Sequence, residues 1–225
     1  MTSVNISVKN KSGAPRAYFL FVQQPEVNLG GKVFSNVYIQ APLVPSGNGT
    51  ASFSCQTDLF AVCGTSPGQP LGSKNPVTTG DWGIAKVNQG GKMGSHFLMR
   101  GDPGNAAAFD GSSLKQDCDQ KGAFLIESTG FKIGNGANQF IGLGARDPSD
   151  PTNIIPVATI AAQPGTQAYF VPKNTYYVSW GTYLPGQFVD ISTISESAEI
   201  DFTGKAATMA KVEHTLDGSW NVTFN

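Results

Sequence analysis

The sequence predicts an all-β protein made of two homologous antiparallel β-sandwich-like repeats, packed about a pseudo-two-fold axis. Three observations lead to this fold class. The 225 residues include 27 Gly and 14 Pro, and only 14% of them are charged. Apolar residues alternate with polar ones or form short runs of strand length. One segment of the chain is also repeated, since the stretch that begins at Gly49 returns at Gly165, 116 residues later.

Short strands joined by turns are expected from this composition, because Gly and Pro interrupt secondary structure and the 40% hydrophobic content is enough to fill a core. The segment 4–10, VNISVKN, alternates apolar and polar residues, and 17–22, AYFLFV, is a continuous apolar run of buried-strand length. Asp217-Gly218 between 207–215 and 219–224 predicts a tight hairpin. We expect at least about twelve strands and little helix.

The repeat is clearest in two segments, 49–69 and 165–187. Both begin with Gly-Thr and end with Pro-Gly-Gln, and in both the interval from a Phe to a later Gly is 11 residues, from Phe53 to Gly64 and from Phe170 to Gly181. Two segments of one chain are expected to keep such spacing when they descend from one folding unit.

The similarity continues on both sides of this block. Upstream, a shift of 123 residues carries segment 12–25 onto 135–148, with Ala14 on Ala137. Downstream, three dipeptides match in order: Asp81-Trp82 with Asp201-Phe202, Lys86-Val87 with Lys211-Val212, and Gly94-Ser95 with Gly218-Ser219. We therefore predict a first β repeat over 1–100, a linker over 101–123 and a second repeat over 124–225. The repeat leaves open whether two sandwiches lie side by side or the halves interleave.

Charge and cysteine content narrow the possible partners and the compartment. A net charge of −1 without a basic run predicts no nucleic-acid partner, and nowhere do about 18 apolar residues run together, so no membrane partner is predicted. The three cysteines are an odd, sparse set, and the N-terminus lacks the pattern of an export signal. These features predict a cytoplasmic protein, and they leave its oligomeric state open.

Motifs for metals, cofactors and covalent catalysis are missing from the sequence. There is no HxH, CxxC or HExxH for a metal and no GxxxxGKS/T or well-placed GxGxxG for a nucleotide. No GxSxG nucleophile elbow is present either. We therefore predict no cofactor and no metal site, and the catalytic residues, if there are any, are unknown.

Function is expected where the two repeats differ, because shared residues are explained by folding. Leu59, Phe60 and Cys63 of the first repeat become Tyr176, Tyr177 and Trp180 in the second. Large rings with polar tips are suited to line a ligand surface. With the junction between the repeats, they give six candidate ligand-binding residues: Trp82, His96, Trp180, Tyr183, Asp190 and His214.

Three functions are compatible with this sequence. The first is non-covalent binding of a small apolar or sugar-like ligand at the aromatic surface or the inter-repeat cleft. The alternative is a cofactor-independent cyclase, isomerase or lyase, in which an apolar pocket orients the substrate beside one or two acid or base groups. The second alternative is a structural protein that associates with itself through an apolar patch or sheet edge.

Overall fold

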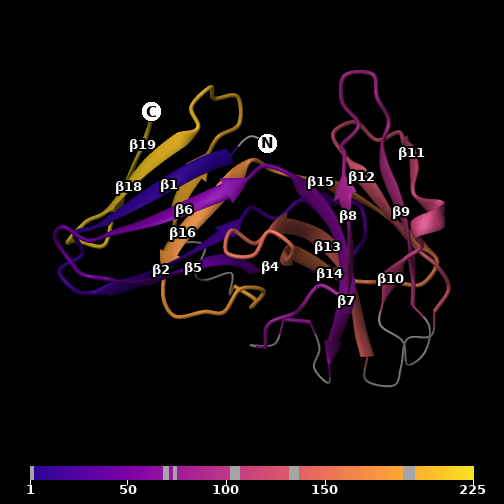
Figure 1. Ribbon diagram of the computed structural model, residues 1–225, viewed down its shortest axis with the longest axis horizontal. Helices are drawn as coiled ribbons and strands as arrows, with labels where there is room; N and C mark the ends of the chain where they lie inside the picture. Colours follow the sequence, from indigo (N-terminus) through magenta and orange to yellow (C-terminus); the bar gives the residue numbers. More distant parts are fainter. Residues whose placement is uncertain (1–2, 68–70, 73–74, 102–106, 132–136, 190–195) are drawn as a thin grey trace.

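The computed structural model of the protein describes residues 3–67, 71–72, 75–101, 107–131, 137–189 and 196–225. Within these ranges the chain forms nineteen strands, one short 3-10 turn and no α-helix. The expected all-β class is confirmed. No helix of the described residues is long and apolar enough to cross a membrane. The strands form four sheets, arranged as two lobes beside each other (Figure 1).

Lobe 1 consists of sheets A and B, which pack face to face. Sheet A has the order β19-β18-β1-β6 and sheet B the order β17-β16-β2-β5. Apolar side chains of both sheets form one core, in which Tyr18 of β2 contacts His214 of β18 edge to face. The strands of lobe 1 are β1 (Ser3–Asn10), β2 (Arg16–Val22), β5 (Val37–Val44), β6 (Thr50–Gln56), β16 (Thr175–Trp180), β17 (Ala198–Asp201), β18 (Met209–His214) and β19 (Trp220–Phe224).

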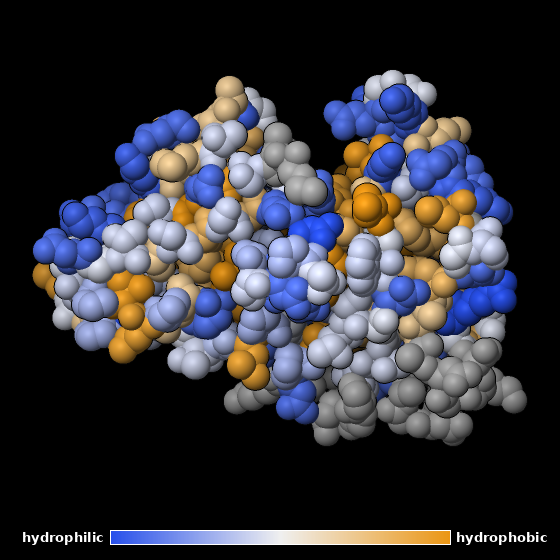
Figure 2. Space-filling view, viewed as in Figure 1, coloured by the Kyte–Doolittle hydropathy of each residue, from blue (hydrophilic) through white to orange (hydrophobic). Residues whose placement is uncertain are grey.

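Lobe 2 consists of sheets C and D. Sheet C has the order β10-β9-β12-β15-β3, with β11 also paired to β9, and sheet D the order β4-β14-β13-β7-β8. The strands of lobe 2 are β3 (Glu26–Val27), β4 (Phe34–Ser35), β7 (Leu59–Pro67), β8 (Asp81–Ala85), β9 (Gly94–Arg100), β10 (Ala108–Phe109), β11 (Lys115–Cys118), β12 (Phe124–Ser128), β13 (Ala137–Arg146), β14 (Ile154–Ala161) and β15 (Thr166–Val171). Figure 2 shows the surface hollowed between the two lobes.

Strands from both halves of the chain meet in every sheet. In sheet A, β1 pairs with β18, and in sheet C, β12 pairs with β9. Both pairs are parallel, so the expectation of purely antiparallel sheets is wrong for sheets A and C. Sequence signals of hairpins reveal neighbours along the chain, whereas a parallel pair needs a long connection and leaves no local signal. The predicted hairpin of β18 and β19 is present.

The central strand pairs of sheets B and D have the same register. In sheet B, β16 pairs with β2 and Trp180 lies opposite Tyr18. In sheet D, β7 pairs with β13 and Cys63 lies opposite Ile141. A shift of 123 residues carries Tyr18 onto Ile141, and a shift of 117 carries Cys63 onto Trp180. These are the shifts that the sequence repeat itself requires, so the pairing and the repeat agree residue by residue.

An irregularity in the neighbouring strand pairs obeys the same shift. Between β2 and β5 the register slips at Leu20-Phe21, and between β13 and β14 it slips at Leu143-Gly144. A shift of 123 residues carries the first pair onto the second. Such β-bulges are kept within protein families because they set the twist and direction of a strand. The two sheets therefore share both their register and a local distortion.

Downstream of residue 80 the predicted matches are wrong. Asp81 lies opposite Cys63 and Asp201 lies opposite Thr175, at opposite ends of their strand pairs. Lys86 follows β8 whereas Lys211 lies inside β18, and Gly94 begins β9 whereas Gly218 is in a turn. The segments that join β8 to β9 and β17 to β18 differ in length, so the three matched dipeptides do not occupy equivalent positions. In strand order, β9 takes the place in sheet C that β18, and not the β18–β19 turn, takes in sheet A.

The three cysteines are small apolar members of the core. Cys55, Cys63 and Cys118 are all buried and free of disulfides. Burial raises the pKa of each thiol above its usual value. These residues therefore contribute packing and not reactivity.

Candidate functional site

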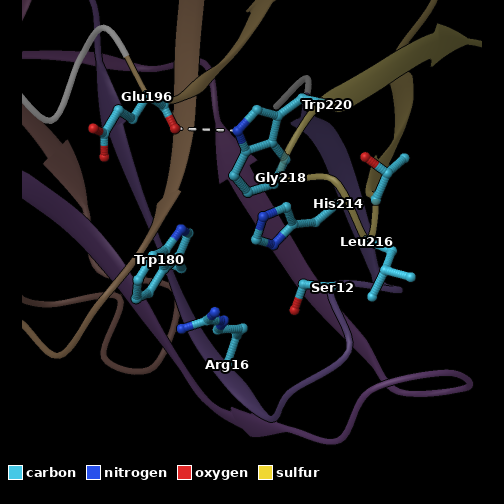
Figure 3. A pocket seen from close by; sticks show the side chains of 9 residues that line it. Ser12, Arg16, Trp180, Glu196, His214, Leu216, Gly218 and Trp220 are labelled. Carbon is cyan, nitrogen blue, oxygen red and sulfur yellow. Dashed lines mark hydrogen bonds between the residues drawn. The ribbon is translucent and has the colours of Figure 1, made fainter.

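A cleft of about 440 Å³ opens at one end of lobe 1, between sheets A and B. Its walls come from the turn between β1 and β2, the ends of β2, β16 and β18, and the β18–β19 hairpin (Figure 3). The lining residues are Ser12, Arg16, Trp180, Glu196, His214, Thr215, Leu216, Gly218 and Trp220. We call this space the aromatic cleft. Both halves of the chain contribute to it.

One side of the aromatic cleft is formed by Arg16 and Trp180. The guanidinium carbon of Arg16 lies 3.8 Å from the centre of the Trp180 ring, a cation–π contact. Strand pairing explains the contact: Trp180 lies opposite Tyr18, so Arg16, Tyr18 and Trp180 project from the same face of sheet B. The ring of Trp180 remains 42% exposed and offers its area to a ligand.

The other side is formed by His214 and Trp220. Their rings stack with centroids 4.1 Å apart and planes 11° from parallel, because the two residues lie directly opposite each other on β18 and β19. The hydroxyl of Tyr18 lies 3.0 Å from Nδ1 of His214, and Nε1 of Trp220 donates to the carbonyl oxygen of Glu196 at 3.1 Å. These hydrogen bonds fix the orientations of the His214 and Trp220 rings.

The electrostatics of the aromatic cleft are set by one cation. Burial lowers the pKa of His214, and the nearby Arg16 charge lowers it further, so the imidazole is neutral at pH 7. Burial raises the pKa of Tyr18 to about 12, which keeps its hydroxyl protonated. Figure 3 shows the carboxylate of Glu196 pointing away from Arg16 and His214. Arg16 is thus the source of positive charge at this site.

The lowered pKa of His214 predicts how stability depends on pH. Above its unfolded pKa of about 6.5, His214 is neutral in both states and contributes no pH dependence. Below that pH, His214 binds a proton in the unfolded chain but stays neutral in the folded chain, so the free energy of unfolding falls as the pH falls. Urea unfolding between pH 7.5 and pH 5 should show a smaller loss in His214→Gln than in the wild type. Equal losses in both proteins would contradict this assignment.

The five predicted site residues that the structure describes do not form one site. Trp180 and His214 meet in the aromatic cleft. Tyr183 packs on Phe19, with ring centroids 4.4 Å apart, and Phe19 projects from the opposite face of sheet B to Tyr18. Trp82 lies on β8 in lobe 2, where it contacts Phe60 edge to face. Asp190 lies outside the described residues.

His96 has a different environment in lobe 2. Its Nδ1 lies 2.8 Å from Asp117 on β11, and its Nε2 lies 3.1 Å from Glu127 on β12. The His96 ring therefore lies between two carboxylates, one at each of its nitrogens. The three residues join three neighbouring strands of sheet C. Among the described residues no group of three His, Cys, Asp or Glu side chains is placed to hold a metal ion.

A second cleft, of about 520 Å³, lies where the two halves of the chain meet. We call it the seam cleft. It is lined mainly by apolar side chains, among them Val22, Tyr38, Leu59, Ala145, Val157 and Tyr176. None of the five predicted site residues that the structure describes contributes to it. The structure therefore separates the two places that the sequence had suggested for one ligand.

Several residues of the aromatic cleft were missed by the sequence analysis. Arg16 lies on β2, far along the chain from Trp180, and only the pairing of β2 with β16 brings the two together. Trp220 has a local signal that was available. The predicted hairpin at Asp217-Gly218 places Trp220 across from His214, so a histidine–tryptophan pair is readable from the turn alone.

The fold and the aromatic cleft together define an all-β protein of two sheet pairs, with one stacked, cationic cleft at its surface. A protein-family comparison adds the family. The RhiA family model matches residues 1–225, and the chain therefore belongs to the RhiA family. Comparisons with curated proteins and with solved structures give no match.

Proposed function

We propose that this protein binds a small sugar-like molecule non-covalently in the aromatic cleft. One observation carries the proposal: two fixed aromatic surfaces, Trp180 on Arg16 and Trp220 on His214, face one open space that is large enough for a small ligand. Clefts that bind small molecules typically measure about 300–1,000 Å³, so 440 Å³ fits.

The lining of the aromatic cleft suits a molecule with both apolar and polar surfaces. Indole rings provide area for the C–H face of a sugar, while a guanidinium and an imidazole provide hydrogen bonds for its oxygens. When Tyr18 donates to Nδ1 of His214, Nε2 carries the proton and is a donor for the ligand. The lining of the seam cleft is mainly apolar and has no tryptophan, which is why we place the sugar-like ligand in the aromatic cleft.

We further propose that the chain is an internal duplication whose halves interleave about a pseudo-two-fold axis. Apart from β3, β4 and β11, lobe 1 takes the first four strands of the first half and the last four of the second half. Lobe 2 takes the last four strands of the first half and the first four of the second. The shared register and the shared bulge support the proposal. The seam cleft would then lie around the axis, since Leu59 and Tyr176, which line it together, are related by the 117-residue shift.

Divergence between the lobes supports a binding role for one of them. The shifts that relate the halves carry Arg16 onto Gln139 and Trp180 onto Cys63. The parallel strand pairs correspond in the same way. His214 lies opposite Asn10 at the end of β1, and Met99 lies opposite Ser128 at the end of β12, so Met99 takes the place of His214 in lobe 2. Lobe 2 therefore lacks the cation, the indole and the imidazole of the aromatic cleft, although its scaffold is alike.

The experiment that tests this function is calorimetric titration with a panel of monosaccharides and disaccharides, neutral and acidic. Trp180→Ala should weaken any binding at least about tenfold, because stacking on an indole contributes on the order of 1 kcal/mol or more. Trp82→Ala is the matched control: that indole is equally exposed, at 40% against 42%, but lies in lobe 2. Binding that Trp180→Ala leaves unchanged, or binding of no member of the panel, would contradict the proposal.

A further inference from the structure

We infer that the ligand of the aromatic cleft carries a carboxylate, as sugar acids do, and that Arg16 binds this group. The inference rests on the proposed function and names the chemical class of its ligand. It follows from the state of Arg16, from the positions of the surrounding carboxylates, and from the geometry of a guanidinium stacked on an indole.

Arg16 differs from the other two arginines of the chain. Arg100 forms an ion pair with Asp110, and Arg146 donates from Nη1 to the carbonyl oxygen of Pro151. Within the described part of the chain, Arg16 has neither kind of partner, and its buried Nε, like that of Arg146, makes no hydrogen bond. A partly buried guanidinium without an acceptor is costly, because its solvation is reduced and nothing replaces it. A bound anion removes this cost.

The acidic side chains near the aromatic cleft that the structure describes are turned away or already engaged. The carboxylate of Glu196 points away from the cleft (Figure 3). Asp217 accepts from the backbone N–H and the hydroxyl of Ser219 within its own turn. Glu213 forms an ion pair with Lys11 at 2.6 Å. Among the described residues, a positive charge thus lies in the cleft while these three carboxylates are directed elsewhere, which favours an anionic ligand.

The guanidinium of Arg16, whose central carbon lies 3.8 Å from the centre of the Trp180 ring, is suited to a carboxylate. A guanidinium is planar, and its N–H groups point outward in that plane. Two parallel N–H groups match the two oxygens of a carboxylate and form a bidentate, charge-assisted pair. The neutral His214 across the cleft does not compete for the anion, and the exposed indole of Trp180 remains available to the ring that carries it.

The test compares matched probes: glucuronate with glucose, and galacturonate with galactose, titrated into the full-length protein. In the wild type each acid should bind at least about tenfold more tightly than its neutral parent, because hydrogen bonds to charged groups are the stronger ones. The affinity for the acid should also fall as NaCl is raised from 50 to 500 mM, while the affinity for the neutral sugar stays constant.

Two variants of Arg16 separate charge from packing. Arg16→Met should remove the preference, so that the acid and its neutral parent bind with equal affinity, and Arg16→Lys should keep part of the preference, because it retains a charge without the planar fork. Equal binding of acid and neutral sugar by the wild type would overturn the inference and leave the proposed function standing. Binding of neither class would overturn both. Thermal unfolding of each variant shows whether a loss of binding comes from a loss of fold.

Discussion

Replacing Gly142 with alanine should lower the free energy of unfolding by about 3 kcal/mol or more. Gly142 is on β13, between β7 and β14 in the middle of sheet D, and a Cβ built on it would lie 2.1 Å from the carbonyl oxygen of Ala158. The clash is with the backbone of a paired strand, so it is not relieved by a rotation of a side chain. Urea unfolding followed by circular dichroism measures the effect.

Gly30→Ala is the matched control for this prediction. Gly30 lies in a connecting segment, and a Cβ built on it meets no atom within 4 Å. We expect its free energy of unfolding to stay within about 0.5 kcal/mol of the wild-type value. If Gly142→Ala were as stable as Gly30→Ala, the pairing of β13 with β14 described above would be incorrect.

The second large effect is expected at the stacked pair Phe124 and Phe170. Their rings lie on the paired strands β12 and β15, with centroids 5.2 Å apart and planes 9° from parallel, and both residues are fully buried. Phe170→Ala removes this contact and leaves a cavity, so the free energy of unfolding should fall by about 3–5 kcal/mol. Guanidinium unfolding with unchanged m-value measures it.

Leu43→Ala provides the comparison, because Leu43 is also a large apolar residue but is 68% exposed. Its loss should cost less than about 0.5 kcal/mol. A small effect at Phe170 would mean that sheets C and D do not enclose it in a shared core. The result also bears on the proposed duplication, because the sequence repeat matches Phe170 with Phe53, a second buried aromatic residue.

Local features of the fold were predictable from the sequence, and the long-range ones were not. The alternation in β1, the apolar run of β2 and the Asp-Gly hairpin are patterns of neighbouring residues, and each corresponds to an observed element. The parallel pairing of β1 with β18 joins the two ends of the chain. Its residues carry no mark of their partner, so only the fold as a whole specifies that pair.

The same distinction explains the candidate site. Trp180 was predicted because it replaces Cys63 in the repeat, and His214 because it is one of only two histidines. Arg16 carried no such signal, since a single arginine at the start of a strand is usually a solvated residue. Gly142 and Phe19 are aligned by the repeat but have different surroundings. Gly142 allows the close approach of β14, whereas Phe19 packs against Tyr183.

The central claim is that a ligand enters the aromatic cleft between the two indoles that line it. Nuclear magnetic resonance of the indole N–H groups tests it most directly, because the chain has three tryptophans, of which Trp180 and Trp220 line the cleft and Trp82 lies in lobe 2. During titration with glucuronate, the Trp180 and Trp220 resonances should shift together while Trp82 stays in place. A shift of Trp82 alone, or three unmoved resonances, would contradict the claim.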